Sequence, residues 1–184
     1  MGKNQRREIC MFYSNRINLF LLVLFTALNC FACIREYKAQ DLRAVCQIMK
    51  SQWAKLTTAP SYNQPMVDDM FTKQVPFDTA HKNKKLYIIV YEIDNQIAGF
   101  ATYYYSSATT GHVELLAISP THQSKGYGKK LMEHIQQQFK DNNAQYIQLY
   151  VYPSNPKAID FYKHLGFDIK MRAMQHWLLS KILK

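Results

Sequence analysis

The clearest chemical signal in the sequence is a glycine-rich stretch, Gln123-Ser124-Lys125-Gly126-Tyr127-Gly128, between an apolar β-branched run and an amphipathic run. Glycines at a strand-to-helix junction let backbone N–H groups turn toward one point, and the helix N-terminus adds partial positive charge there. Lys125, Lys129 and Lys130 add full positive charges. This combination predicts a binding site for a phosphate or pyrophosphate group.

The spacing of this stretch, Q-x-x-G-x-G, differs from two familiar phosphate-binding loops. A Walker A loop needs GxxxxGK[ST], which the sequence lacks. A dinucleotide fingerprint, GxGxxG, needs a glycine where Leu131 stands. Taken alone, the stretch also fits a glycine turn that only caps a helix.

A second block, Asn155-Pro-Lys-Ala158-Ile-Asp-Phe161-Tyr162-Lys-His-Leu165-Gly166-Phe167, follows a later apolar run. Together the two blocks resemble the GCN5-related N-acetyltransferase (GNAT) family, in its order and at its usual separation. The resemblance covers Ile34 to the C-terminus and does not specify the acceptor.

The resemblance implies an α/β (α+β) domain over residues 34–184, after a separate hydrophobic segment at 1–33. Its sheet would be mixed and mostly antiparallel, with six to seven strands flanked by helices. It would splay open between two central parallel strands, 112–119 and 146–152. The co-substrate acetyl-CoA would bind in this splay, so the resemblance implies transfer of an acetyl group from its thioester to a primary amine.

The residues that would bind acetyl-CoA follow from the same resemblance. The thioester carbonyl would bond the backbone near Leu116, Ala117 and Ile118. The second block would border the pantetheine arm through Asn155, Ala158 and Phe161. The pyrophosphate would rest on the glycine-rich loop, formed by Gln123, Ser124, Lys125, Gly126, Tyr127, Gly128 and Lys129.

Direct transfer to an amine needs a base for the ammonium proton and an acid for the departing thiolate. The family block assigns the acid to Tyr162, since a phenol of pKa ~10 is a plausible donor to a thiolate. Glu114 and His112 are the candidates for the base. They are two apart on one predicted strand and face the same side unless a bulge intervenes. The same residues also fit plain structural roles, Tyr162 in a core and His112 at a strand end.

Tyr103 and Tyr105 are candidates for the acceptor site, because acceptor sites in the family often border this hairpin. Strand alternation sends these two to one face and Tyr104 to the other. No histidine has a partner at metal-ligand spacing, so a metal site is not expected.

Hydrophobic periodicity predicts the elements that position these residues. An extended segment at 34–37 precedes strands at 86–93, 96–105, 112–119, 146–152 and 172–180, with Asp94-Asn95 as a tight turn. Helices are predicted at 42–50, 66–73, 128–140 and 156–164. Asp41 is the expected N-cap of the first helix.

Charge and cysteine content limit the alternatives. The chain of 184 residues has 23 Lys and Arg against 13 Asp and Glu, a net charge of +10. Such a balance suits an anionic partner. All four cysteines lie within the first 46 residues, so a disulfide framework or zinc site within the body is excluded.

The first 33 residues are a separate problem. Basic residues precede the apolar run Leu19–Leu28, and Cys30-Phe31-Ala32 follows it, as in a secretory signal peptide. Extended over 17–34, the segment marginally reaches the length of a membrane anchor. A mis-called start is the third interpretation. Because acetyl-CoA is cytosolic, the working hypothesis is a cytoplasmic catalytic domain, with export or anchoring left open.

Two further classes of function compete with an acetyltransferase. One is a non-catalytic acyl-CoA-binding sensor, which would bind the donor without transfer. The other is a basic RNA-binding module, which would merge with the first class if the acceptor amine were on a charged tRNA, although no helix-turn-helix, zinc finger or aromatic RNP pattern is present. A nucleic-acid partner is therefore not favoured, and a homodimer is consistent with the resemblance.

Overall fold

The structure, a computed structural model, describes residues 32–57 and 61–183. Within these residues one sheet of seven strands has the order β1-β2-β3-β4-β5-β7-β6. The strands are β1 (Ala32–Glu36), β2 (Tyr87–Ile93), β3 (Gln96–Tyr105), β4 (Thr110–Ile118), β5 (Tyr146–Val151), β6 (Asp168–Arg172) and β7 (Trp177–Ile182). Only the β4–β5 pair is parallel, and every other neighbouring pair is antiparallel. The expected mixed, mostly antiparallel sheet with two central parallel strands is confirmed.

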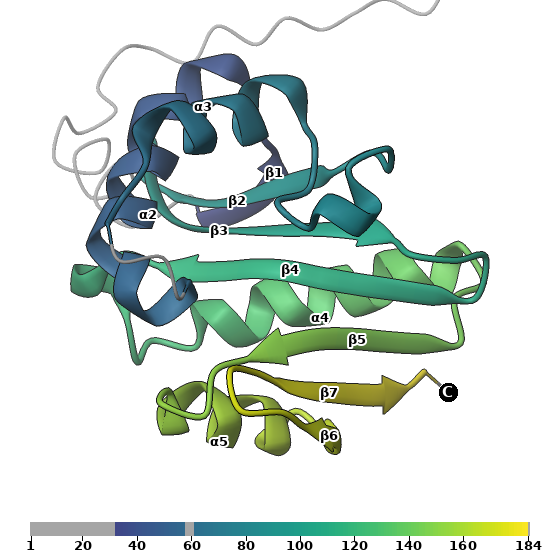
Figure 1. Cartoon of the computed structure of the whole chain (residues 1–184). Helices are drawn as coiled ribbons and strands as arrows, with labels where there is room; N and C mark the ends of the chain where they lie inside the picture. Colours follow the sequence, from purple (N-terminus) through teal and green to yellow (C-terminus); the bar gives the residue numbers. More distant parts are fainter. Residues whose placement is uncertain (1–31, 58–60, 184) are drawn as a thin grey trace, which may run out of the picture. The chain divides into compact units, whose positions relative to one another are not determined.

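The helices cover both faces of this sheet (Figure 1). They are α2 (Leu42–Leu56), α3 (Gln64–Lys73), α4 (Tyr127–Asp141) and α5 (Pro156–His164), with short 3-10 turns at Ala39–Asp41, Thr79–His81 and Pro120–His122. One core lies under α2 and α3 and includes Phe71, Phe100 and Tyr104. The other core contains residues of α4 and α5, including Phe139 and Ile159. The sheet is therefore the middle layer of a three-layer domain.

Local sequence explains most of these elements. Strands β2 and β3 are rich in β-branched and aromatic residues, and Asp94 and Asn95 both adopt positive φ in the turn between them. Such a turn matches the twist of a hairpin. In α4, Leu131, Ile135 and Phe139 recur every four residues and are fully buried.

A β-bulge interrupts β4 next to the parallel pair. Thr102 of β3 pairs with Leu115, whereas Tyr103 pairs with Val113, so Glu114 is an extra residue without a partner on β3. A bulge of this kind redirects side chains and changes the faces of the residues that follow. Val113 accordingly lies in the α4 core and Leu115 in the α2 core.

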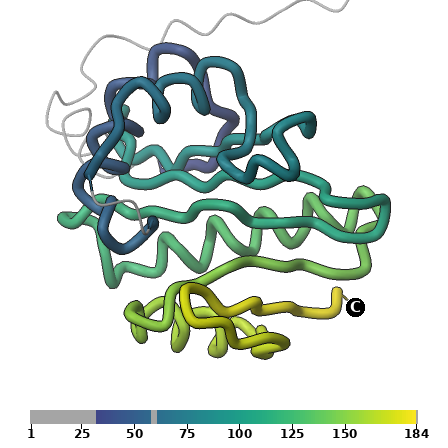
Figure 2. The backbone as a smooth tube through the Cα atoms, in the orientation of Figure 1, coloured from purple at the N-terminus to yellow at the C-terminus, as the bar shows by residue number. Residues whose placement is uncertain are grey.

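Two predicted elements differ from the structure. Helix α2 continues to Leu56 rather than ending near Lys50, because Trp53 carries its buried stripe one turn further. The single strand predicted at 172–180 is wrong: β6 and β7 form a hairpin instead (Figure 2). A bond from the Ala173 amide to the His176 carbonyl closes its turn, which contains no glycine or proline to mark it.

The predicted signal or anchor segment lies almost entirely outside the described residues. Strand β1 begins at Ala32, two residues before the expected start of the domain. No helix within residues 32–57 and 61–183 is both long and apolar enough to cross a bilayer.

Candidate active site

The centre of the site is the point where β4 and β5 separate. They pair only from Thr110 to Val113 and from Tyr146 to Leu149, so the rest of β4 has no partner on that side. A cavity of about 830 Å³ opens there. All but one of the expected donor-binding residues line it: Leu116, Ala117, Ile118, Gln123, Ser124, Gly126, Tyr127, Gly128, Lys129, Asn155, Ala158 and Phe161. The exception is Lys125, which is not part of the lining.

The glycine-rich loop has the backbone shape expected of a phosphate site. Ser124 and Gly126 adopt positive φ values of 61° and 81°, and Gly126 is the N-cap of α4. A Cβ on Gly126 would meet nothing within 4 Å, so its φ, rather than lack of room, requires glycine there. Because a glycine cap offers no side-chain acceptor, the first amides of α4 are available to an anion.

Three lysines surround the cavity, and they come from three helices. Lys129 lies on α4, Lys157 on α5 and Lys55 on α2. Lys130 has another role, because its Nζ donates to the Tyr91 hydroxyl at 3.2 Å. The charge of the lining therefore suits a polyanion such as coenzyme A.

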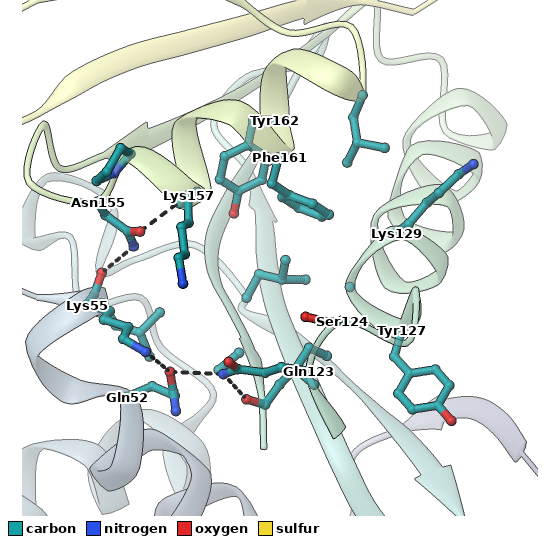
Figure 3. Close-up of a pocket in the computed structure, with 18 of the residues that line it drawn as sticks. Gln52, Lys55, Gln123, Ser124, Tyr127, Lys129, Asn155, Lys157, Phe161 and Tyr162 are labelled. Carbon is teal, nitrogen blue, oxygen red and sulfur yellow. Dashed lines mark hydrogen bonds between the residues drawn. The ribbon is translucent and has the colours of Figure 1, made fainter. Parts of the chain in front are cut away.

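Tyr162 of α5 reaches the cavity from the α4 side of the sheet. Figure 3 shows its hydroxyl directed into the cavity, beside Phe161. The side chain is otherwise buried, and burial raises its pKa well above the usual range. Because its pKa is raised, the hydroxyl stays protonated near neutral pH and has a proton to donate.

Glu114 lies at the apex of the splay, as the bulged residue directly after the last β4–β5 pair. Its Oε1 accepts a hydrogen bond from the Asp78 amide at 3.1 Å. Its Oε2 is buried and has no partner among the described residues. Burial raises the pKa of this carboxyl to about 7, against the smaller opposing effect of the Asp78 and Phe77 amides. One oxygen of a half-ionised carboxylate is thus left to accept a proton.

His112 is held in a row of aromatic rings. Its ring centre lies 5.0 Å from that of Tyr104 and 5.3 Å from that of Tyr150. The row continues to His81 beside Tyr104 and to His176 beside Tyr150. Burial lowers the pKa of His112 to about 4, so the imidazole is neutral at physiological pH.

The structure does not bring Tyr103 and Tyr105 to this group. Both rings pack edge-on against Phe139 of α4. Tyr104 is the tyrosine that faces the candidate base, and its hydroxyl donates to Asp78 Oδ2 at 3.3 Å. Strand alternation separated the three tyrosines correctly, but it does not say which face the acceptor approaches.

Sequence reasoning missed the contributions of α2 and of the loop before β2. Gln52 and Lys55 line the cavity from the last turns of α2. Asp78 holds Glu114 through its amide and pairs with His81 at 2.7 Å. No motif marks either segment, and the only available signal was the apolar stripe that α2 continues to Trp53. In the described ranges, no group of three or more potential ligands could hold a metal ion.

Comparisons with known proteins agree with this geometry. A family model described as the Acetyltransferase (GNAT) family matches residues 42–167. The catalytic subunit naa20 of the N-terminal acetyltransferase B complex of Schizosaccharomyces pombe is 30% identical over 66 residues, which are 36% of this chain and 37% of the relative. Streptothricin acetyltransferase of Streptomyces lavendulae is 33% identical over 75 residues, 40% of each chain. The chain thus spans well under half the length of these relatives.

Among solved structures, the PaiA N-acetyltransferase of Thermoplasma acidophilum, in complex with coenzyme A, superposes with a TM-score of 0.64. The superposition covers 83% of this chain and 99% of that one at 17% identity, which shows a shared fold. Together with the family model, which extends over more than half of the sequence, this fold gives the assignment. The chain belongs to the Acetyltransferase (GNAT) family.

Proposed function

We propose that this protein is an acetyl-CoA-dependent N-acetyltransferase that transfers the acetyl group directly to a primary amine. The observation that carries the proposal is the cavity where β4 and β5 separate, lined by the glycine-rich loop and by Tyr162. Glu114, whose buried Oε2 has no partner among the described residues, follows the last β4–β5 pair but is not part of the cavity lining. When bound, acetyl-CoA supplies an acetyl thioester as the group to be transferred.

On the donor side, the chain would bind and orient the co-substrate. The amides of Gly126 and the first turn of α4 would hold the pyrophosphate, with Lys129 and Lys157 adding charge. The free edge of β4 from Leu116 to Ile118 would bond the pantetheine arm and the thioester carbonyl, since its groups have no strand partner on the β5 side.

On the acceptor side, Glu114 Oε2 would take the proton from the incoming ammonium group. Its pKa of about 7 suits this task, because a base is most effective when its pKa is near the working pH. Its other oxygen is held by the Asp78 amide, which fixes the orientation of the carboxyl group. We assign the base to Glu114 rather than His112, whose ring packs at a tilt between two tyrosine rings.

On the leaving-group side, Tyr162 would donate its hydroxyl proton to the departing thiolate. A raised phenol pKa keeps the proton on the oxygen until the thiolate develops. The hydroxyl points into the cavity, whereas the bulk of the ring is held in the core of α5 (Figure 3).

The acceptor is open within the class of primary amines. One relative is named for N-terminal acetylation and another for streptothricin, so the names do not agree on one acceptor. A membrane tether through residues 17–34, a homodimer and a cytoplasmic catalytic domain stay predictions.

The test is a calorimetric titration of acetyl-CoA into the full chain, followed by an amine screen that measures the release of free CoA thiol. We expect saturable one-site binding and thiol release that depends on one class of amine. Binding without release to any amine would favour the acyl-CoA sensor. A folded chain that does not bind acetyl-CoA would overturn the proposal.

A further inference from the structure

A chain of hydrogen bonds joins residues that line the donor cavity, and it has no role in the chemistry proposed above. On α2, Gln52 Oε1 accepts from Gln123 Nε2 at 3.2 Å and from Lys55 Nζ at 3.3 Å. Gln123 Nε2 also donates to the Ile118 carbonyl at 3.1 Å. On the opposite wall, Asn155 Nδ2 donates to the Lys55 carbonyl at 3.3 Å. Figure 3 shows these side chains arranged around the cavity.

These bonds join the C-terminal part of α2 to the segments that follow β4 and β5, on the two sides of the splay. Gln123 follows β4 and Asn155 follows β5, two strands that do not pair beyond Val113 and Leu149. Helix α2 therefore makes a connection that the sheet itself lacks. Gln52 is buried, with 7% of its surface exposed, so water competes little for its bonds.

Gln52 is poorly suited to contact a phosphate itself. Its carbonyl oxygen already accepts from two donors, and a second acceptor such as a phosphate oxygen would be repelled there. Its amide nitrogen is 3.4 Å from Ser51 Oγ. Its effect on a ligand would have to pass through the residue it holds, Gln123.

We propose that Gln52 is a positioning residue of the donor site. Its carbonyl holds the Gln123 amide against the Ile118 carbonyl and so orders the loop that enters α4. That loop contains two positive-φ residues, and a loop ordered before binding loses less conformational entropy when the ligand arrives. This inference rests on the proposed function, because it requires the loop to bind the diphosphate of acetyl-CoA.

Single variants of the full chain test the inference by calorimetric titration with acetyl-CoA. Gln52→Met removes the acceptor and keeps the length of the side chain, and Gln123 keeps its bond to Ile118, so no buried donor is stranded. Gln47→Met makes the same change at an exposed position of the same helix. Thermal unfolding of each variant verifies that it folds.

We expect Gln52→Met to raise the Kd for acetyl-CoA about threefold to tenfold, the effect of one hydrogen bond. Gln47→Met should bind like the wild type. In a Gln123→Ala background the further change Gln52→Met should have no effect, because Gln52 would have nothing left to hold.

Two results would overturn the inference while the wild type still binds acetyl-CoA. One is an unchanged Kd for Gln52→Met. The other is an equal loss with and without the Gln123 side chain, which would mean that Gln52 acts through the general stability of α2. Failure of the wild-type chain to bind acetyl-CoA would be a separate result that removes the proposed function itself.

Discussion

Burial acts on Glu114 and Tyr162 in the same direction, and it suits them to the opposite proton-transfer roles proposed for them. It raises the pKa of both groups, because a low-dielectric surrounding disfavours the charged form of each. For Glu114 the result is a carboxylate that can accept a proton near neutrality. For Tyr162 it is a phenol that holds its proton until a strong base appears beside it.

The first prediction concerns the pH dependence of turnover. Because Glu114 must be ionised to accept a proton, kcat/KM should rise with pH through about 7 and then level off. Glu114→Gln keeps the size of the side chain and removes the base, so it should lower kcat by ~10²–10⁴-fold and abolish this rise. Steady-state rates from pH 5.5 to 9 measure both effects.

The stability of Glu114→Gln relative to the wild type verifies that the variant folds, and its direction of change with pH can be predicted. The native pKa of Glu114, about 7, lies above that of an unfolded glutamate, so ionising it within the fold costs stability as the pH rises through 7. The free energy of unfolding of Glu114→Gln should therefore exceed that of the wild type by about 1–3 kcal/mol at pH 8. At pH 4 the two proteins should be similarly stable. An inactive variant that is less stable at pH 8 would indicate a structural role for Glu114.

The second prediction separates catalysis from packing at Tyr162. Tyr162→Phe keeps the ring in the core and removes only the hydroxyl that points into the cavity. We expect kcat to fall by ~10²-fold with the Kd for acetyl-CoA nearly unchanged, because the proton is needed mainly in the transition state. Comparable losses in kcat and in donor affinity would mean that the hydroxyl is structural.

At the scale of elements, the loop between β4 and α4 depends on its backbone shape. Gly126 adopts a φ of 81° and lies at the N-cap of α4. Gly166 has a φ of 84° beyond the end of α5 and does not line the cavity, so it is a matched control.

The third prediction uses this pair of glycines. Gly126→Ala and Gly166→Ala should each lower stability by ~1–2 kcal/mol, the cost of a left-handed alanine. Only Gly126→Ala should also weaken acetyl-CoA binding, by about tenfold or more, because bonds to a charged phosphate depend on the direction of the loop amides. Calorimetry and thermal unfolding of both variants distinguish the two effects. Equal affinity in the two variants would contradict a role for the loop in binding.

The point where β4 and β5 stop pairing is a second feature at the scale of elements. The cavity opens there, since the two strands separate beyond their last pair. The bulge places Glu114 at that junction rather than in register with β3. The aromatic row begins at His81 in the Thr79–His81 turn, passes His112 on β4 and ends at His176 in the β6–β7 turn.

At the scale of the whole molecule, an ion-pair network ties the first strand to the rest. Arg35 of β1 bonds both carboxylate oxygens of Asp41, at 2.7 Å and 2.9 Å, and also contacts Glu92 of β2. Asp41 further accepts from the Lys38 amide at 2.8 Å. Although it is the N-cap residue of α2, as predicted, its carboxylate serves this network rather than the helix amides.

The fourth prediction concerns acid stability. The Arg35 hydrogen bonds hold the pKa of Asp41 below its ordinary value, despite the opposing effect of burial. Its stabilising contribution is therefore present above the pKa of an unfolded aspartate, ~3.9, and is lost as the pH falls through the lowered native value. Asp41→Asn should destabilise the fold by ~1–3 kcal/mol at pH 7 and by much less at the acid limit. Denaturant unfolding at both pH values measures the difference, and a cost independent of pH would contradict this account.

The sequence alone was sufficient for the family and for the position of the glycine-rich loop. The residues of the glycine-rich loop and of the block from Asn155 to Phe167 are each contiguous, so their spacing expresses their geometry directly. Strand alternation likewise separated Tyr104 from its two neighbours. A sequence pattern determines the conformation of a short contiguous segment, and each of these parts of the site is such a segment.

Only the tertiary structure decided how the two sides of the site meet. The bond from Asp78 to Glu114 joins residues 36 apart, that from Gln123 to Gln52 joins residues 71 apart, and that from Asn155 to Lys55 joins residues 100 apart. The bulge at Glu114 and the end of the β4–β5 pairing are relations between strands, which no single strand encodes. The physical reason is that long-range contacts are determined by the packing of the whole chain. The bulge at Glu114, the Asp78 amide that holds its carboxyl group and the connection through α2 are therefore visible only in the fold.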